Sequence, residues 1–348
     1  MERMWFMGLF SKLFSKNDKI QESVKVNVEV KTEIEKCQPD IPELQGDYAK
    51  TIFLWAHDKA TPIKKNDEYA RYFLYECGIR DVTSYHKKLI SEEYFTEASI
   101  ESRLASLKVN ELKEILTDLG QSVSGKKEVL IKRINESTDV TTITKYIPVV
   151  LYELSDKGKK FVEENNDYVL IHKHKNWGID WKQYDQLHKP GYSFYDTMWG
   201  VFNKRIAKDT QHFGRNEYLN MYQLLREEGK RLSALEMLLR VLYIDLSGVE
   251  GKSIYELYKK GIYTKKEAME YFNVAIMLAP GIIHPIYEYK DIYVDSLVDK
   301  LYEQKLPVQI CEKTLFLEIV HSVLNETYDE KTTETILRKE YKKLIDKI

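Results

Sequence analysis

Apolar side chains recur at helical spacing through most of the sequence, and this rhythm predicts a mainly α-helical protein. The first half also contains shorter apolar runs, bounded by turn residues, that are typical of strands. In that half we expect an apolar run over 51–57, helices over 68–77 and 83–91, and strands over 94–98 and 149–154. From residue 168 to the C-terminus the pattern predicts helices.

The most regular local pattern lies in residues 104–134. Leucine and isoleucine residues between Leu104 and Leu119 give the rhythm of a helix with its lead-in, and Gly120 stands where a helix ends in a left-handed residue. Ser124 is a favourable N-cap for a second helix. The predicted buried side of that helix consists of Val129, Leu130, Ile131 and Ile134. We therefore expect two helices joined by an extended loop.

Positive charge gathers where the second of these helices begins. The free N–H groups that follow Ser124 and Gly125, together with the helix dipole, favour an anion, and Lys126 and Lys127 lie at the same end. Other cations extend this surface toward neighbouring phosphates, namely Lys108, Lys113, Lys132 and Arg133. The alternative is an ordinary helical hairpin whose lysine face is only solvated.

This pattern resembles the SAP motif, a helix, extended loop and helix unit that binds DNA. The residues that carry the resemblance are Gly125-Lys126-Lys127 and the Leu130-Ile131 pair, and the unit covers about a tenth of the chain. The resemblance implies contact with the phosphates of double-stranded DNA, which holds the duplex but carries little sequence information. The overall layout also resembles SAP-containing proteins of Gram-positive prophages and mobile elements.

A second resemblance concerns the segments on either side of this unit. Leu154-Ser155-Asp156-Lys157-Gly158 is similar to the phrase that precedes the last helix of winged-helix transcription factors. If residues 151–154 pair with 94–98, these strands and the helix 83–91 form a winged-helix-like domain whose wing tip the SAP-like unit replaces. The resemblance then implies that the major groove is contacted by Tyr85, His86, Lys87 and Lys88. The alternative is that these helices only support the SAP-like unit.

Two segments further along the chain form an imperfect repeat. Residues 229–247 align with 261–280 at a separation of 34 residues, which places Ala234 over Ala268. Both resemble the second helix of a tetratricopeptide repeat, with residues 216–228 as the first helix of the earlier unit. An open repeat array implies a surface for a protein partner. A closed helical core explains the same small residues equally well.

Aromatic residues are dense between Trp177 and Phe202, and helical spacing indicates that most of them are core. They alternate with Lys182, Lys189, Lys204 and Arg205, so stacking on unpaired bases is the alternative.

Composition limits the classes of function. The 348-residue chain has a formal charge of -2, so any DNA contact must come from a local patch rather than a general basic field. Its three cysteines lie far apart, which favours a reducing cytoplasm over a disulfide scaffold. No apolar stretch reaches membrane-spanning length. Residues 1–16 are amphipathic, with the pattern of an interfacial membrane anchor or of a tail that docks on the protein.

Motifs for catalysis are nearly absent. His172 and His174 would point the same way on a strand, but no standard ligand spacing completes a metal site around them. The glycines near Lys252 lack the spacing of a phosphate-binding loop. We therefore predict no metal, no cofactor and no enzymatic activity. A nuclease that uses these histidines is a distant alternative.

The predicted architecture is mainly α. It comprises an amphipathic N-terminus and linker (1–47), a winged-helix-like domain (48–98 with 148–166), the inserted or appended SAP-like unit (100–136), a helical region with tetratricopeptide-like hairpins (167–292) and C-terminal helices (293–348). The predicted function is non-enzymatic binding of double-stranded DNA, with a protein partner on the helical C-terminal region. The alternative is a protein-interaction scaffold, membrane-associated through its N-terminus, that does not bind DNA.

Overall fold

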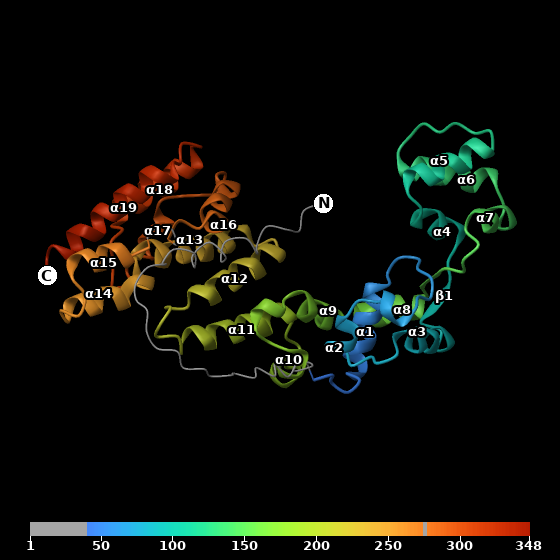
Figure 1. Ribbon diagram of the computed structural model, residues 1–348, viewed down its shortest axis with the longest axis horizontal. Helices are drawn as coiled ribbons and strands as arrows, with labels where there is room; N and C mark the ends of the chain where they lie inside the picture. Colours follow the sequence, from blue (N-terminus) through green and yellow to red (C-terminus); the bar gives the residue numbers. More distant parts are fainter. Residues whose placement is uncertain (1–39, 274–276) are drawn as a thin grey trace, which may run out of the picture. The chain divides into compact units, whose positions relative to one another are not determined.

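The computed structural model describes residues 40–273 and 277–348, and the chain in this part is mainly helical, as the sequence predicted (Figure 1). The compact unit Pro42–Ile348 contains three hydrophobic clusters. We name them the front core (buried residues between Tyr48 and Phe95, with Leu154), the insert core (between Ala98 and Leu151) and the rear core (between Ile171 and Ile345). The predicted amphipathic segment 1–16 and Cys37 lie outside the described residues.

The front core is built from chain segments that precede and follow the helical insert, residues 100–146. Its elements are α1 (Gly46–Ala56), η1 (Asn66–Glu68), α2 (Tyr72–Tyr75), α3 (Val82–Ser91), β1 (Phe95–Glu97), β2 (Tyr152–Leu154), α8 (Asp156–Glu164) and α9 (Asn166–Lys173). Phe53, Phe73 and Leu89 are fully or nearly fully buried within it. Burial of such aromatic and aliphatic side chains is the main force that holds these short elements together.

The two strands pair as the sequence predicted. β1 and β2 are antiparallel, with Phe95 opposite Leu154 and Glu97 opposite Tyr152. Thr61 adds an isolated bridge, because its N–H and C=O each bond to the backbone of Tyr152 at 2.9 Å. The chain therefore leaves and re-enters the front region at one small sheet, and the insert lies between the two strands in sequence.

Ser155 and Gly158 show why the Leu-Ser-Asp-Lys-Gly phrase suits this position. Ser155 is the N-cap of α8, where its Oγ accepts the N–H of Gly158 at 3.1 Å and donates to the carbonyl of Glu93 at 2.6 Å. A Cβ atom on Gly158 would lie 2.3 Å from the carbonyl oxygen of Tyr94. Only glycine allows α8 to approach the end of α3 and the start of β1 this closely.

Two of the predicted front helices differ from the structure. The helix expected over 68–77 is shorter, since only Tyr72–Tyr75 is α-helical after a 3-10 turn. The next helix begins at Val82 rather than at residue 83, and its N-cap is Asp81. Asp81 accepts the Ser84 N–H at 2.9 Å, which is the preferred capping geometry.

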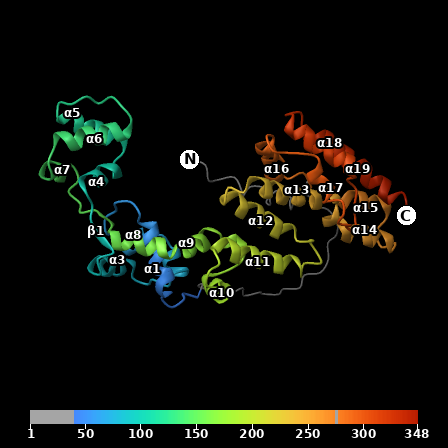
Figure 2. The ribbon, with the colours of Figure 1, turned by 180° about the vertical axis from the view of Figure 1, so that it is seen from behind.

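The helical insert, residues 100–146, consists of α4 (Ile100–Ser106), α5 (Val109–Asp118), α6 (Lys127–Ser137) and α7 (Val140–Tyr146). α5 and α6 lie side by side in both views (Figures 1 and 2), and α4 also contacts α6. The insert core includes Leu104, Leu112, Leu116, Leu130 and Ile134, each with no exposed surface. α7 adds Ile143 to this core and was not predicted as a separate helix.

The rear core is wholly helical. Its elements are η2 (Lys175–Trp177), α10 (Trp181–Leu187), α11 (Phe194–Ile206), α12 (Arg215–Glu227), α13 (Arg231–Ser247), η3 (Val249–Gly251), α14 (Lys252–Lys259), α15 (Lys265–Tyr271), α16 (Pro280–Ile283), η5 (His284–Tyr289), α17 (Ser296–Asp299), α18 (Lys313–Leu324) and α19 (Glu330–Ile345). α13 is the central helix, because 11 of its 17 residues are buried. The cluster extends from Ile171 to Ile345, across the domain boundary predicted at residue 292.

The predicted repeat is not regular in the structure. α12 and α13 form the expected helical hairpin, but α13 has 17 residues whereas the aligned helix α15 has seven. Phe272, which aligns with Leu238 inside α13, is instead the C-cap of α15. In the described ranges no helix has the length and apolar character needed to cross a membrane.

Candidate nucleic-acid interface

The first helix of the hairpin ends in a turn that sets the direction of the loop. Gly120 has φ of +67°, its N–H bonds to the carbonyl of Thr117 at 3.0 Å, and the N–H of Gln121 bonds to that of Leu116 at 2.8 Å. These two bonds define a Schellman motif, which requires a left-handed residue at the glycine position. The loop then leaves α5 toward the start of α6, as the position of Gly120 predicted.

The Arg133 side chain holds the extended loop between α5 and α6 in place. Its guanidinium donates to the carbonyl oxygens of Ser122 and Ser124, the second at 3.0 Å. The hydroxyls of the two serines lie 2.9 Å apart. Arg133 was predicted to contact phosphate, but the structure uses it to hold the loop. A planar guanidinium with several N–H donors suits two carbonyls at once.

The second helix begins two residues later than predicted. α6 starts at Lys127, and its N-cap is Lys126 rather than Ser124, with no side chain bonded to the cap position. Within the described residues, the N–H groups of Lys127 and Glu128 have no protein acceptor. These groups lie at the positive end of an 11-residue helix. The start of α6 is therefore open to an anion.

The two lysines at this end differ in what they contact. Lys127 is half-buried, and its Nζ donates to the carbonyl of Ala105 at the end of α4, at 2.7 Å. Lys126 is exposed and forms no ion pair with the described residues. Lys127 therefore links the start of α6 to α4, and Lys126 is the cation available to a ligand.

The remaining predicted cations of the insert are on its surface. Lys108 and Lys113 are exposed on α5 and its N-cap, and the backbone N–H of Lys108 is capped by the carboxylate of Glu111 at 2.5 Å. Lys132 is also exposed and lies 3.8 Å from Glu136. An exposed ion pair of this kind is weak, so phosphate can replace the carboxylate at little cost.

One predicted core residue of the hairpin is wrong. Val129 is 46 % exposed, whereas Leu130, Ile131 and Ile134 are buried as expected. Its side chain instead lies against Gly125, where a Cβ would be 3.0 Å from Val129 Cγ1. Gly125 has φ of +129°, so this glycine lets the loop turn tightly over the first residues of α6.

The helix predicted to enter the major groove is organised differently. His86 has no exposed surface, its Nδ1 lies 2.9 Å from the hydroxyl of Tyr69, and its ring lies 4.9 Å from Phe95. The prediction that His86 contacts DNA is therefore wrong. Lys87 and Lys88 are exposed, and Lys88 pairs with Glu92 at 3.7 Å. His86 faces the core because it shares a helical face with Val82 and Leu89.

The two histidines considered for a metal site lie in and just after a helix rather than on a strand. His172 lies in α9, 2.8 Å from Glu76, and His174 follows it, 3.0 Å from Glu227 and stacked on Trp177. Among the described residues no group of three or more histidine, cysteine or acidic side chains is placed to hold a metal. Their carboxylate partners connect α9 to other elements.

Sequence reasoning missed the structural roles of Arg133 and Lys127. The signal for Arg133 was its position three residues after Leu130, one turn along α6 from a buried side chain. A cation at such a position packs its stem along the apolar surface, and its head group can then reach backbone carbonyls at the edge of that surface.

Comparison with known families gives one finding for this region. The SAP domain matches residues 103–139, which include α5, the extended loop and α6. Comparison of the chain with curated proteins found no match, and comparison with solved structures found none. The chain therefore carries a SAP domain. Because SAP domains are in general DNA-binding units, the open start of α6 is the candidate nucleic-acid interface.

Proposed function

We propose that this protein binds double-stranded DNA through the SAP domain, without catalysing a reaction on it. The observation that carries the proposal is the start of α6. Its N–H groups have no capping side chain, and the adjacent Lys126 is exposed and unpaired within the described residues. A phosphate at this position accepts backbone N–H bonds and neutralises the lysine.

The surrounding charge supports a limited footprint. Residues 103–139 contain seven Lys and Arg but also six Asp and Glu, so the insert is not a general polycation. Lys108, Lys113 and Lys132 provide further contacts to phosphates next to the one at α6. Affinity then depends on a few neutralised phosphates and falls with added salt in proportion to their number.

The proposal also gives roles to the front domain and to the rear helices. The pairing of β1 with β2 supports a winged-helix-like front domain, and Lys87 with Lys88 would add a second, weaker phosphate contact. The rear helices would bind a protein partner. We place this activity in the cytoplasm, which suits the buried free thiols of Cys77 and Cys311, and in a prophage or mobile-element setting.

The experiment is a salt titration of duplex binding by the full chain. Lys126→Ala lowers affinity and reduces the slope of log K against log salt by about 0.9, because one neutralised phosphate is lost. Lys339→Ala removes an equally exposed charge from α19 and serves as the matched control, with no change in slope.

Two results would count against the proposal. One is a slope that Lys126→Ala leaves unchanged. The other is the absence of duplex binding together with Lys126-dependent binding to an acidic protein. That second result favours the alternative scaffold function, in which the lysine surface meets carboxylates instead of phosphates.

A further inference from the structure

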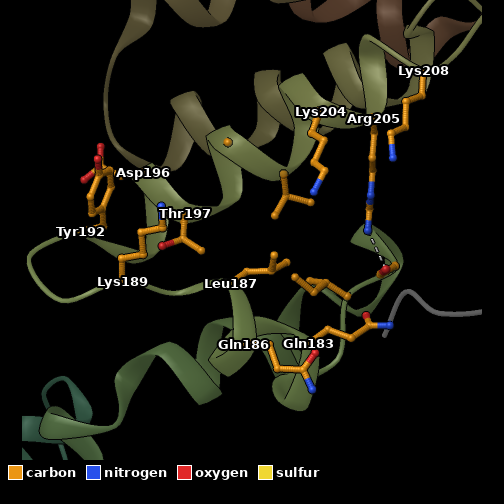
Figure 3. A pocket seen from close by; sticks show the side chains of 14 residues that line it. Gln183, Gln186, Leu187, Lys189, Tyr192, Asp196, Thr197, Lys204, Arg205 and Lys208 are labelled. Atoms are coloured by element: carbon orange, nitrogen blue, oxygen red, sulfur yellow. Dashed lines mark hydrogen bonds between the residues drawn. The ribbon is translucent and has the colours of Figure 1, made fainter.

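A second positively charged site lies in the rear helices, far from the SAP domain in sequence. α10 and α11 border an open groove with a volume of about 560 Å³, a size suited to a small organic ligand (Figure 3). Its lining includes Lys189, Lys204, Arg205 and Lys208. Four cations around one groove are unexpected in a chain whose formal charge is -2.

Three of these cations lack carboxylate partners. Arg205 donates to the carbonyls of Trp177 and Gly178 at 2.6 and 2.7 Å and lies 3.7 Å from Glu217, so it is part of the fold. By contrast, no carboxylate among the described residues forms an ion pair with Lys189, Lys204 or Lys208. Like charges that converge without counter-ions repel one another, and a bound anion would remove that cost.

The lysines are not spread evenly around the groove. Figure 3 shows Lys204 of α11 and Lys208, just beyond the end of that helix, at one end of the groove, while Lys189 and Tyr192 lie at the other. Asp196 is also at that second end, where its carboxylate accepts the N–H and hydroxyl of Ser193 at 3.0 and 2.6 Å. The lysine pair therefore makes one end the better place for a dianionic group.

The opposite end offers apolar surface. Tyr192 is 57 % exposed and Leu187 is 43 % exposed, although the sequence indicated that aromatic residues of this stretch are core. That expectation holds for Trp177, Phe194 and Phe202, which are buried. An exposed ring beside cations is the combination on which a nucleobase stacks.

Gly200 gives an independent indication of a ligand. It lies inside α11 and lines the groove, and a Cβ atom there would meet nothing within 4 Å. Packing therefore does not require glycine, and glycine inside a helix is less favourable than alanine. A ligand that lies directly against the helix backbone would need this position to have no side chain.

From these observations we infer that the groove between α10 and α11 binds a nucleotide. Lys204 and Lys208 bind its phosphates, Tyr192 and Leu187 contact the base, and Gln186 with Lys189 provides donors for the base edge. The same chemistry is present in a free nucleoside triphosphate and in the unpaired end of a nucleic-acid strand. This site is separate from the SAP domain and does not depend on its function.

The test is calorimetric titration of the full chain with ATP, inorganic triphosphate and a short single-stranded oligothymidylate. Lys204→Ala with Lys208→Ala weakens nucleotide binding about tenfold or more, because two charge-assisted contacts are lost. Lys339→Ala with Lys342→Ala on α19 removes the same charge and leaves binding unchanged. Including Lys126→Ala in every protein used with the oligonucleotide reduces any contribution of the SAP domain.

Gly200→Ala separates binding from folding. Alanine favours the helix, so Tm stays the same or rises, while the added methyl group lowers nucleotide affinity several-fold. Binding of ATP in preference to triphosphate supports a free nucleotide, and binding of the oligonucleotide alone supports a strand end. The inference is overturned if neither ATP nor the oligonucleotide binds, or if triphosphate and ATP bind with equal affinity. It is also overturned if the α19 control variant weakens binding as much as the groove variant does.

Discussion

Two lysine pairs in this protein look alike in sequence, but they lie in helices whose N-termini are capped differently. Lys87-Lys88 lies in α3, whose N-terminus is capped by Asp81 through bonds to the N–H and hydroxyl of Ser84 at 2.9 and 2.7 Å. Lys126-Lys127 lies at the start of α6, which has no capping side chain. The carboxylate of Asp81 already occupies the place of an anion in α3, and in α6 that place is open.

If the proposed function holds, the cap decides which helix can receive a phosphate more than the number of lysines does. Hydrogen bonds from Ser84 hold the pKa of Asp81 below its usual range, so the cap stays charged at neutral pH. A phosphate near α3 would meet this negative charge. The two regions also have separate hydrophobic cores, so each can be altered with a distinct result.

The largest expected effect comes from the insert core. Leu130→Ala removes a fully buried side chain of α6 and costs the insert about 2 to 5 kcal/mol. We expect loss of duplex binding, together with faster hydrogen exchange in α5 and α6 while α1 and α3 remain protected. The matched change in the front core, Leu89→Ala, should have the reverse pattern. Duplex binding that survives Leu130→Ala but not Leu89→Ala would assign the interface to α3.

The next effect is a difference in pH dependence between the two cores. Burial, and then the nearby His57, lowers the pKa of His86 from 6.5 to about 4, and burial lowers the pKa of His57 as well. His86 therefore stays neutral in the folded protein above about pH 4, whereas in the unfolded chain it gains a proton below about pH 6.5. The front core is therefore fully stabilised above that pH and loses stability as pH falls toward 4.

The size of this effect follows from the shift. Between pH 7 and pH 5, protonation of unfolded His86 alone costs the front core about 2 kcal/mol. Residues 98–151 contain no histidine, so the insert core should keep its stability over the same range. Hydrogen exchange, corrected for the intrinsic effect of pH, measures both cores in one sample. Equal loss in the two cores, or none in the front core, would contradict the assignment of His86 as a buried neutral ring.

The sequence predicted the SAP hairpin from local rules, whereas the β1–β2 pairing followed from the resemblance to a winged-helix domain. Gly120 marks the end of α5 through its left-handed backbone, and short apolar runs that contain Phe95 and Leu154 mark the two strands. The start of α6 was placed at Ser124 because serine is a good N-cap. Arg133, nine residues further along, bonds to the carbonyl of Ser124 and keeps this residue in the loop. Helical spacing places Arg133 one turn after Leu130, but only the packed hairpin shows which carbonyls it bonds.

Helix orientation was harder to predict than helix position. Lys87, Lys88 and His86 are adjacent in sequence, but the helical repeat turns His86 toward Phe95 and both lysines toward solvent. The groove between α10 and α11 was outside the reach of sequence reasoning for a similar reason. Lys189, Lys204 and Lys208 are separated in the sequence, and they line one groove only in the folded chain.

The most direct test of the central claim adds a cap to α6, removes the cap of α3, and measures stability and duplex affinity for each variant. Lys126→Asp gives α6 a capping carboxylate and should stabilise the insert by about 1 kcal/mol. Asp81→Ala removes the cap of α3 and should cost the front core a similar amount.

We predict that Lys126→Asp weakens duplex binding about tenfold or more although the insert becomes more stable, because the carboxylate takes the position of the phosphate. Asp81→Ala should leave duplex affinity unchanged. Full duplex affinity in a stabilised Lys126→Asp protein would contradict the account, since the open start of α6 would then not be where the DNA backbone binds.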